Sequence, residues 1–119
     1  MDNKFDVIVI GGGQSGLAVG YYLRRTGLRS IILDKEEEAG GAWQHFWKSL
    51  RLFSPAQWSS LPGVIMPGGG NYYPTREETI QYLREYEHKY QLPVKRPVLV
   101  RSVTRTENGF QLGTSKGLF

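Results

Sequence analysis

The first residues that could do chemistry form the glycine-rich stretch Gly11-Gly12-Gly13-Gln14-Ser15-Gly16, which fits the pattern G-x-G-x-x-G. Gly11 permits a tight turn, Gly13 leaves room for a phosphate because it has no Cβ, and Gly16 lets a helix pack closely. Free amide N–H groups at the start of that helix can hold an anion. The pattern therefore predicts that this turn binds the pyrophosphate of a dinucleotide.

An acidic residue, Asp34, lies 18 positions after Gly16, at the end of the next predicted strand. Its carboxylate can accept hydrogen bonds from both hydroxyls of an adenosine ribose, and it would repel a 2′-phosphate. Asp34 therefore favours FAD or NAD over NADP in this site. The alternative is a solvated carboxylate with no ligand.

A second glycine pair, Gly40-Gly41, is followed by Ala42 and Trp43. The glycines again permit close backbone approach, and the indole offers a flat apolar wall with one N–H donor. Together they could cover the ribityl and ring parts of a flavin, which favours FAD over NAD. An ordinary turn stays open for the glycines, as does core packing for Trp47 and Trp58.

Three predicted elements position the glycine motif. The β-branched run Phe5–Ile10 predicts a buried strand, the apolar spacing over Gln14–Thr26 predicts a helix, and Ser30–Asp34 predicts a second buried strand. These elements form one β-α-β unit with parallel strands and a right-handed crossover.

The rest of the chain adds a long connection, a helix and further strands. Residues 35–73 hold all three tryptophans, and this aromatic content predicts an ordered segment wrapped on another element. Thr75 and Glu78 form a capping box for a helix that ends near residue 90. A short third parallel strand follows at 92–94, and the region 98–112 predicts a hairpin.

These elements predict an α/β fold: a Rossmann-like dinucleotide-binding domain whose parallel sheet carries a β-hairpin or meander layer. With 119 residues there is room for one domain. No closing helix follows the last predicted strand, which predicts a truncated domain.

Composition excludes several other classes. The chain has no cysteine, which excludes disulfides, thiolate zinc sites and redox dithiols, and its two histidines leave no basis for a metal site. The net charge of +4 is spread evenly, which argues against a nucleic-acid groove. No apolar run approaches the roughly 20 residues of a membrane span and no signal peptide is seen, so a cytoplasmic protein is predicted.

The remaining charged side chains are predicted to be solvated. His45 is expected to be structural or solvent-facing, and His88 is expected on a helix surface. The basic residues of the hairpin region are expected to form a solvated face: Lys95, Arg96, Arg101 and Arg105. The sequence singles out no catalytic residue.

Taken together, these motifs resemble the start of the flavin-containing monooxygenases, which are related to Baeyer–Villiger monooxygenases and to flavoproteins with two dinucleotide domains. The resemblance rests on residues 6–16, 32–34 and 40–43. Residues 43–62 and 73–76 further resemble the flavin monooxygenases of bacterial arsenic-resistance operons. The disulfide-reductase branch is disfavoured because it places cysteines soon after the diglycine.

The resemblance implies that residues 1–119 are the N-terminal FAD-binding part of a longer flavoprotein. It assigns the pyrophosphate to the glycine motif, the adenosine to the end of the second strand, the flavin to the diglycine region, and an adenine contact to a backbone group of the hairpin. The implied cofactor-binding residues are Gly11, Gly13, Gln14, Ser15, Gly16, Asp34, Lys35, Gly41, Ala42, Trp43, Ser54 and Val100.

In the full-length enzyme, the resemblance implies that NADPH, held by a downstream domain absent from this chain, reduces the flavin. Molecular oxygen then oxygenates a small substrate with a soft nucleophile, N, S or As. The isolated chain is expected to bind FAD without turnover. Two alternatives stay open: a non-catalytic dinucleotide-binding fragment or assembly module that self-associates through an open sheet edge, and an NAD-binding module.

Overall fold

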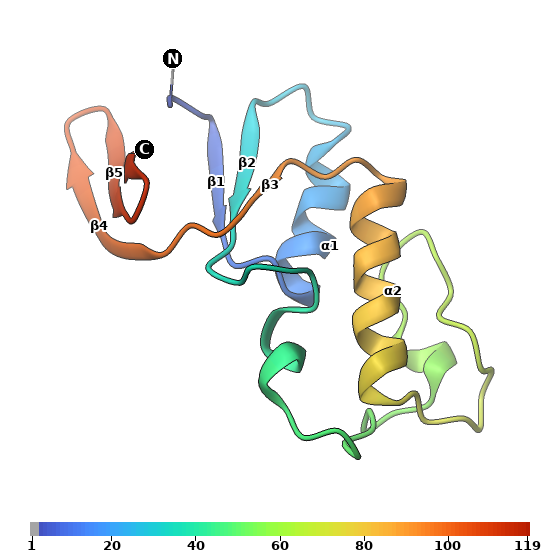
Figure 1. Ribbon diagram of the computed structural model, residues 1–119. Helices are drawn as coiled ribbons and strands as arrows, with labels where there is room; N and C mark the ends of the chain where they lie inside the picture. The colour runs from blue at the N-terminus through green and yellow to red at the C-terminus, as the bar shows by residue number, and fades with distance from the viewer. Residues whose placement is uncertain (1–2) are drawn as a thin grey trace.

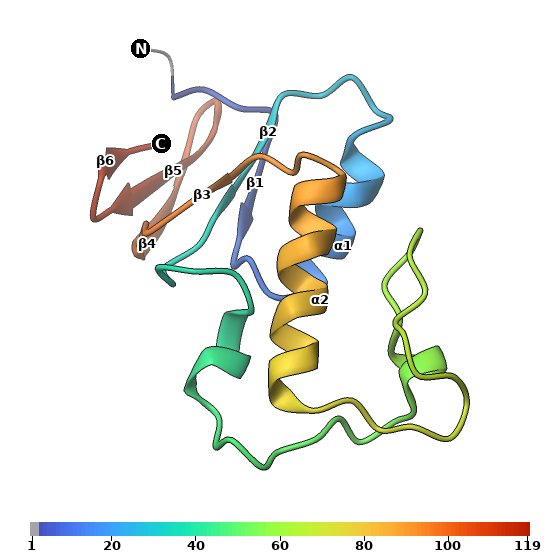
Figure 2. The ribbon, with the colours of Figure 1, turned by 45° about the vertical axis from the view of Figure 1, so that its right-hand side comes forward.

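The computed structural model describes residues 3–119 and has an α/β fold in three layers (Figure 1). A parallel sheet with strand order β1-β2-β3 lies in the middle, with the helices α1 and α2 on one face and the antiparallel sheet β4-β5-β6 on the other (Figure 2). This is the predicted Rossmann-like arrangement. Within the described part of the chain, no helix is long and apolar enough to cross a membrane.

The predicted β-α-β unit is confirmed, with β1 at Val7–Ile10, α1 at Gln14–Leu23 and β2 at Ser30–Leu33. The two strands pair in parallel along their whole length. The helix ends earlier than predicted because the Thr26 hydroxyl donates to the Leu23 carbonyl at 2.8 Å and accepts from the Leu28 amide at 3.1 Å. The chain then turns through Gly27, whose φ is +74°.

Alternate side chains of β2 enter two separate cores, because successive residues of a strand point to opposite faces. Ile32 packs under the helices with Leu17, Leu83 and Tyr86. Leu33 packs on the opposite face, in a cluster that includes Leu112 of the antiparallel sheet. Strand β2 is therefore packed on both faces, which agrees with its nearly continuous apolar run.

Helix α2, Arg76–Lys89, begins at the predicted capping box. The Glu78 amide donates to the Thr75 hydroxyl at 3.1 Å, and the Thr75 amide donates to the Glu78 carboxylate at 2.9 Å. The hydrogen bonds from the Thr75 backbone and the Tyr72 hydroxyl lower the pKa of Glu78. The first turn therefore keeps a negative charge at the positive end of the helix.

Residues 46–74, here called the aromatic segment, make up most of the predicted segment 35–73 and pack against α2. The segment has little regular structure beyond one short 3-10 helix, Ala56–Ser59, and an isolated bridge between Arg51 and Thr75. Two tyrosines of α2 hold it: the Tyr82 hydroxyl donates to the Val64 carbonyl, and the Tyr86 hydroxyl donates to the Pro62 carbonyl, both at 2.5 Å.

The remaining strands complete both sheets. The third parallel strand, β3 at Val94–Lys95, starts later than predicted, although the Ile32 amide already donates to the Pro93 carbonyl at 2.9 Å. The predicted hairpin is confirmed as β4, Val100–Thr106, and β5, Gly109–Thr114. A short strand that the sequence did not predict, β6 at Gly117–Leu118, pairs with β5 and makes the hairpin a meander.

Candidate dinucleotide-binding site

The glycine turn, residues 11–16, runs from the carboxyl end of β1 into the first turn of α1. Gly11 has φ +107°, and its amide donates to the Leu33 carbonyl at 2.8 Å, which extends the sheet pairing into the turn. A Cβ on Gly16 would lie 1.9 Å from the Gly11 carbonyl oxygen. Gly16 therefore allows the helix to approach the turn as closely as it does.

Gly13 leaves open space in front of the helix. It is the N-cap residue of α1 and provides no side-chain cap. A Cβ on Gly13 would have no atom of the surrounding structure within 4 Å, and Gln14 and Ser15, which follow it, are exposed. The first amides of α1 have no partner within the helix, so they are available to an anion at this opening.

The diglycine lies directly against this turn. A Cβ on Gly41 would lie 2.9 Å from the Cα of Gly13, and Gly41 has φ +53°. The two glycine motifs, far apart in the sequence, therefore meet at one place in the fold. Ala42, which follows, is exposed.

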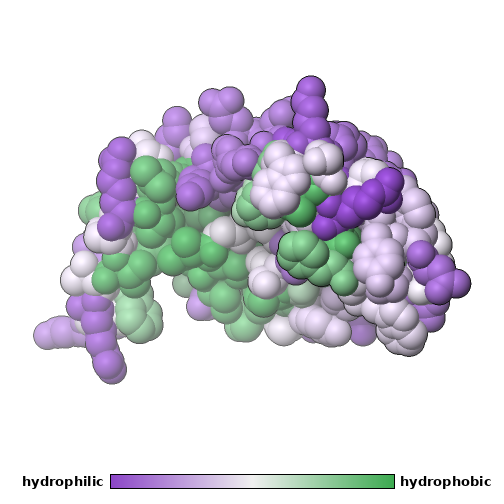
Figure 3. Space-filling model, turned by 90° about the horizontal axis from the view of Figure 1, so that it is seen from below, coloured by the Kyte–Doolittle hydropathy of each residue, from purple (hydrophilic) through white to green (hydrophobic). Residues whose placement is uncertain are grey.

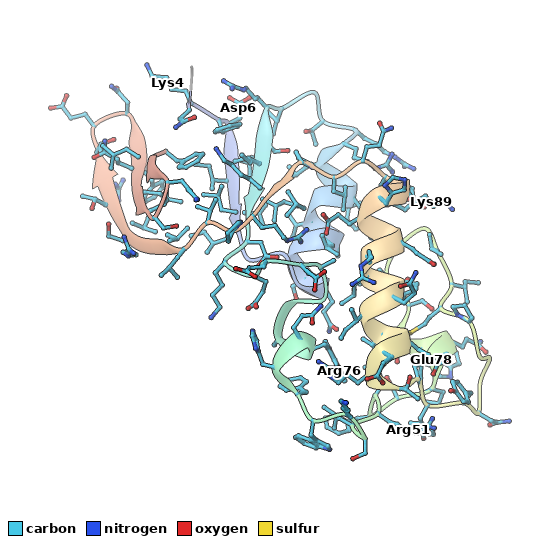
Figure 4. All side chains as sticks on the ribbon, viewed as in Figure 1. Lys4, Asp6, Arg51, Arg76, Glu78 and Lys89 are labelled. Carbon is cyan, nitrogen blue, oxygen red and sulfur yellow. The ribbon has the colours of Figure 1, made fainter. Side chains whose placement is uncertain are left out.

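Arg76 holds the second motif in place from the first turn of α2 (Figure 4). Residues Gly41–His45 form a 3-10 helix, and Arg76 donates from Nε to the Trp43 carbonyl at 2.9 Å and from Nη2 to the Gln44 carbonyl at 2.7 Å. No local sequence pattern signals this contact, because it joins residues more than 30 positions apart.

The three tryptophans differ in their surroundings. Trp43 is half-buried, packs against the core below the helices and meets Phe46 edge-on with ring centroids 5.1 Å apart. Trp47 and Trp58 are 63% and 71% exposed, so core packing is wrong for both. Trp58 instead lines a hollow of about 290 Å³ with Gln14 and Ser54, which places these two predicted residues side by side.

Asp34 is buried, with 2% of its surface exposed, so the alternative of a solvated carboxylate is wrong. Its Oδ2 lies 2.7 Å from where a Cβ on Gly12 would stand and accepts a hydrogen bond from Arg96 Nε at 2.9 Å. The predicted ribose acceptor thus lies directly behind the glycine turn. Lys35, the next residue, is exposed.

Arg96 corrects the prediction of a solvated basic face. Its side chain is only 15% exposed and forms ion pairs with both Asp34 and Glu87. The partners lie 62 and 9 positions away in the sequence, and no local pattern signals such a pairing. The other basic residues of that predicted face are exposed as expected: Lys95, Arg101 and Arg105.

The start of the meander also lies close to Asp34. The Val98 amide donates to the Asp34 carbonyl at 2.7 Å, and Val100, two residues further on, packs half-buried against the core that contains Leu33. An adenine contact at Val100 stays a prediction. His45 is exposed and meets Glu36 at 2.6 Å, and His88 is exposed on α2 as expected.

The described residues contain no group of three or more side chains that could hold a metal ion. What the site offers is a binding surface: amide donors at the start of α1, a buried carboxylate behind them, and a second glycine motif in contact with the first. This arrangement suits an extended ligand that carries phosphate groups and a ribose.

Comparison with known proteins agrees with this geometry. Residues 8–119 match the family model described as pyridine nucleotide-disulphide oxidoreductase. The chain belongs to this family. Its three-layer fold is the Rossmann-like fold of the FAD-binding part of flavin monooxygenases. As a member without cysteine, this chain itself supplies no redox dithiol.

Individual relatives include several monooxygenases. The flavin-containing monooxygenase from Stenotrophomonas maltophilia is 54% identical with a TM-score of 0.89, over 95% of this chain and 34% of that one. An uncharacterized oxidoreductase CzcO-like from Geobacillus kaustophilus is 39% identical over 98% of this chain and 34% of its own length. Indole-3-pyruvate monooxygenase YUCCA6 from Arabidopsis thaliana is 30% identical over 85% of this chain and 24% of its own length.

This chain therefore spans about one third of the length of the CzcO-type relatives it matches. The match covers the whole glycine turn, Asp34 and the diglycine, because it extends over 98% of the chain in the first of them. Every residue of the candidate site thus lies within the part of the chain that matches the family model.

Proposed function

We propose that this chain binds FAD and forms the FAD-binding part of an NAD(P)H-dependent flavin monooxygenase. The observation that carries the proposal is the contact between the two glycine motifs. Gly41 lies against Gly13 beside an opening that a Cβ on Gly13 would enter, and Asp34 is buried behind Gly12. The pyrophosphate, the adenosine ribose and the flavin side of FAD can therefore be bound at one place.

The residues present fit FAD in its separate parts. The opening at Gly13 suits the pyrophosphate, with the amides of Gln14 and Ser15 as donors. Asp34 suits the adenosine ribose because a carboxylate accepts from hydroxyl groups. Gly41 and the hollow next to Gln14 extend the site toward the predicted flavin side. When bound, FAD supplies the redox chemistry, and this chain's residues bind and orient it.

The activity of the whole protein is part of the same proposal. We propose that NADPH reduces the flavin through a separate dinucleotide site, and that oxygen is transferred to a small substrate with a soft nucleophile, N, S or As. The 54% identity with a bacterial flavin-containing monooxygenase supports the reaction class. The arsenic substrate rests on the resemblance of residues 43–62 and 73–76 alone.

A titration of the purified chain with FAD tests the proposal. We expect flavin fluorescence to be quenched and the melting temperature to rise at micromolar FAD, with no comparable rise for NADH. Gly13→Ala should weaken binding about 100-fold, or about 2.7 kcal/mol, because its methyl group enters the space for the phosphate. The substitution meets no atom within 4 Å, so the melting temperature without ligand should hold.

Gly70→Ala is the matched control, because its Cβ would meet only the end of the Gln57 side chain, at 3.2 Å. This variant should bind FAD as the wild type does. A wild-type chain that leaves FAD fluorescence unchanged would overturn the proposal, and so would a Gly13→Ala chain with wild-type affinity.

A second candidate function is assembly through the open edge of the parallel sheet. Among the described residues, β1 pairs only with β2, and a groove of about 670 Å³ runs between β1 and the meander. Its lining includes Ile10, Val103 and Phe110, which are 56%, 52% and 67% exposed. Viewed from below, a hydrophobic surface extends from the meander toward the middle of the molecule (Figure 3).

Light scattering during size-exclusion chromatography tests this second candidate. A dimer at micromolar concentration that Ile10→Lys converts to a monomer would support pairing of two copies at this edge. A wild-type monomer over the same concentration range would remove the assembly role and leave FAD binding unaffected.

A further inference from the structure

A buried ion network connects Asp34 to helix α2 through Arg96. Arg96 lies in the connection between β3 and β4 and donates from Nε to Asp34 Oδ2 at 2.9 Å. Its two terminal nitrogens donate to the two carboxylate oxygens of Glu87 at 2.7 and 2.9 Å. The side chains of Asp34, Arg96 and Glu87 are 3%, 15% and 18% exposed. One guanidinium thus holds two carboxylates in fixed positions.

The network fixes the orientation of the Asp34 carboxylate. Oδ2 is confined between Arg96 Nε and the backbone at Gly12, and Oδ1 accepts from the Glu36 amide at 3.4 Å. The Asp34 backbone is also held, because its carbonyl accepts from the Val98 amide. An ionised carboxylate has about four acceptor positions. Hydrogen bonds from Arg96 and Glu36 fill two of them.

Glu87 has a distinct part in this arrangement. It binds two nitrogens of Arg96 and leaves Nε directed at Asp34, so the orientation of the guanidinium depends on α2. Burial disfavours the charged form, but the hydrogen bonds from Arg96 to Glu87 and Asp34 outweigh it and raise the pKa of Arg96. The guanidinium therefore stays charged at neutral pH.

We propose that Arg96 is a positioning residue for ribose recognition: it holds Asp34 so that the free acceptor positions of the carboxylate meet the adenosine ribose hydroxyls, and Glu87 in turn holds Arg96. This inference rests on the proposed FAD binding and adds to it a residue that the sequence analysis placed on a solvated face. The plain alternative is an ion network that only stabilises the fold.

The two roles separate in an experiment that compares two ligands. For each variant, two dissociation constants are measured: that of FAD and that of its analogue without the 2′-hydroxyl on the adenosine ribose. The ratio is the dissociation constant of the analogue divided by that of FAD. We expect the wild type to prefer FAD about tenfold, the size of one hydrogen bond to a charged group. A role in folding alone would lower stability but leave this ratio unchanged in the folded molecules.

Arg96→Gln should reduce the ratio to about one, as should Asp34→Asn, and the double variant should show no further loss because the two residues act as a unit. Arg96→Lys can serve only part of the network, so its ratio should fall in between. Glu87→Gln should also lower the ratio, and it serves as the test should Arg96→Gln fail to fold. Arg101→Gln, exposed on β4, is the control and should keep the wild-type ratio.

Each remaining outcome overturns the inference at an identifiable step. If the wild type binds FAD with a ratio of one, Asp34 does not recognise the ribose, although FAD binding stands. If Asp34→Asn lowers the ratio while the Arg96 and Glu87 variants keep it, Asp34 acts without Arg96. If the wild type binds no FAD, the proposed function itself fails.

Discussion

The glycine turn and the aromatic segment are both irregular connections that adjoin the candidate site, yet they are held in different ways. The turn, residues 11–16, is fixed by backbone contacts. The Gly11 amide donates a hydrogen bond to the Leu33 carbonyl of β2, and Gly16 packs on the Gly11 carbonyl. The aromatic segment, residues 46–74, is held by a few buried side chains, such as Ala56 and Met66, and by side-chain hydroxyls of α2 that bond its backbone. The first region tolerates no added atom at Gly16, whereas the second exposes large aromatic side chains.

This difference predicts that the glycine turn is the more sensitive region, and Gly16→Ala is the strongest test. Its methyl group would lie 1.9 Å from the Gly11 carbonyl oxygen, so either the turn or the helix must move. We expect a loss of about 3 kcal/mol in the free energy of unfolding. Urea denaturation followed by far-UV circular dichroism measures it.

Gly13→Ala is the matched substitution within the same turn, because its Cβ meets nothing within 4 Å. It should unfold at the wild-type urea concentration. Equal losses for the two variants would show that the turn is not packed as described, and the contrast between the two regions would fail.

The same contrast explains how much the sequence could predict. Glycine spacing, strand periodicity and the capping box at Thr75 and Glu78 are local patterns, and they located β1, α1, β2 and α2 with element ends shifted by a few residues. Arg96 was misplaced because its partners, Asp34 and Glu87, come from two other elements. The charge of Arg96 by itself indicates exposure. Its burial depends on carboxylates that only the fold brings next to it.

The aromatic segment shows the same limit from the other side. Its aromatic content correctly predicted an ordered wrap, but not which of its rings are buried. Trp47 and Trp58 project outward, whereas the segment's Ala56 and Met66 enter the core. The hydroxyls of Tyr82 and Tyr86 bond its backbone as well. Composition predicts that such a segment is ordered, whereas only the tertiary contacts decide its orientation.

An intermediate effect is expected for Tyr82→Phe, which removes the hydroxyl and keeps the ring. The hydroxyl donates to the Val64 carbonyl at 2.5 Å and accepts from the Leu61 amide at 2.8 Å. Burial raises the pKa of Tyr82, so the hydroxyl keeps its donor proton at neutral pH. Loss of both bonds should cost about 2 kcal/mol and speed amide hydrogen exchange in residues 61–64.

Tyr22→Phe is the control for this prediction, since Tyr22 is 61% exposed on α1. It should change neither stability nor exchange. Uniformly faster exchange in the Tyr82→Phe variant, without a focus on residues 61–64, would mean that the segment is not held separately from the core.

The smallest effect is expected for Trp58→Ala, because 71% of the surface of Trp58 is exposed. An exposed side chain adds little to stability, so the free energy of unfolding should change by less than about 0.5 kcal/mol. Trp43→Ala should cost more, about 1–2 kcal/mol, since Trp43 packs against the core and meets Phe46 edge-on. If Trp58→Ala were the more destabilising of the two in urea titrations, the segment would have to be packed through its indoles. Its attachment through the tyrosine hydroxyls would then be secondary, and the two regions would no longer differ in kind.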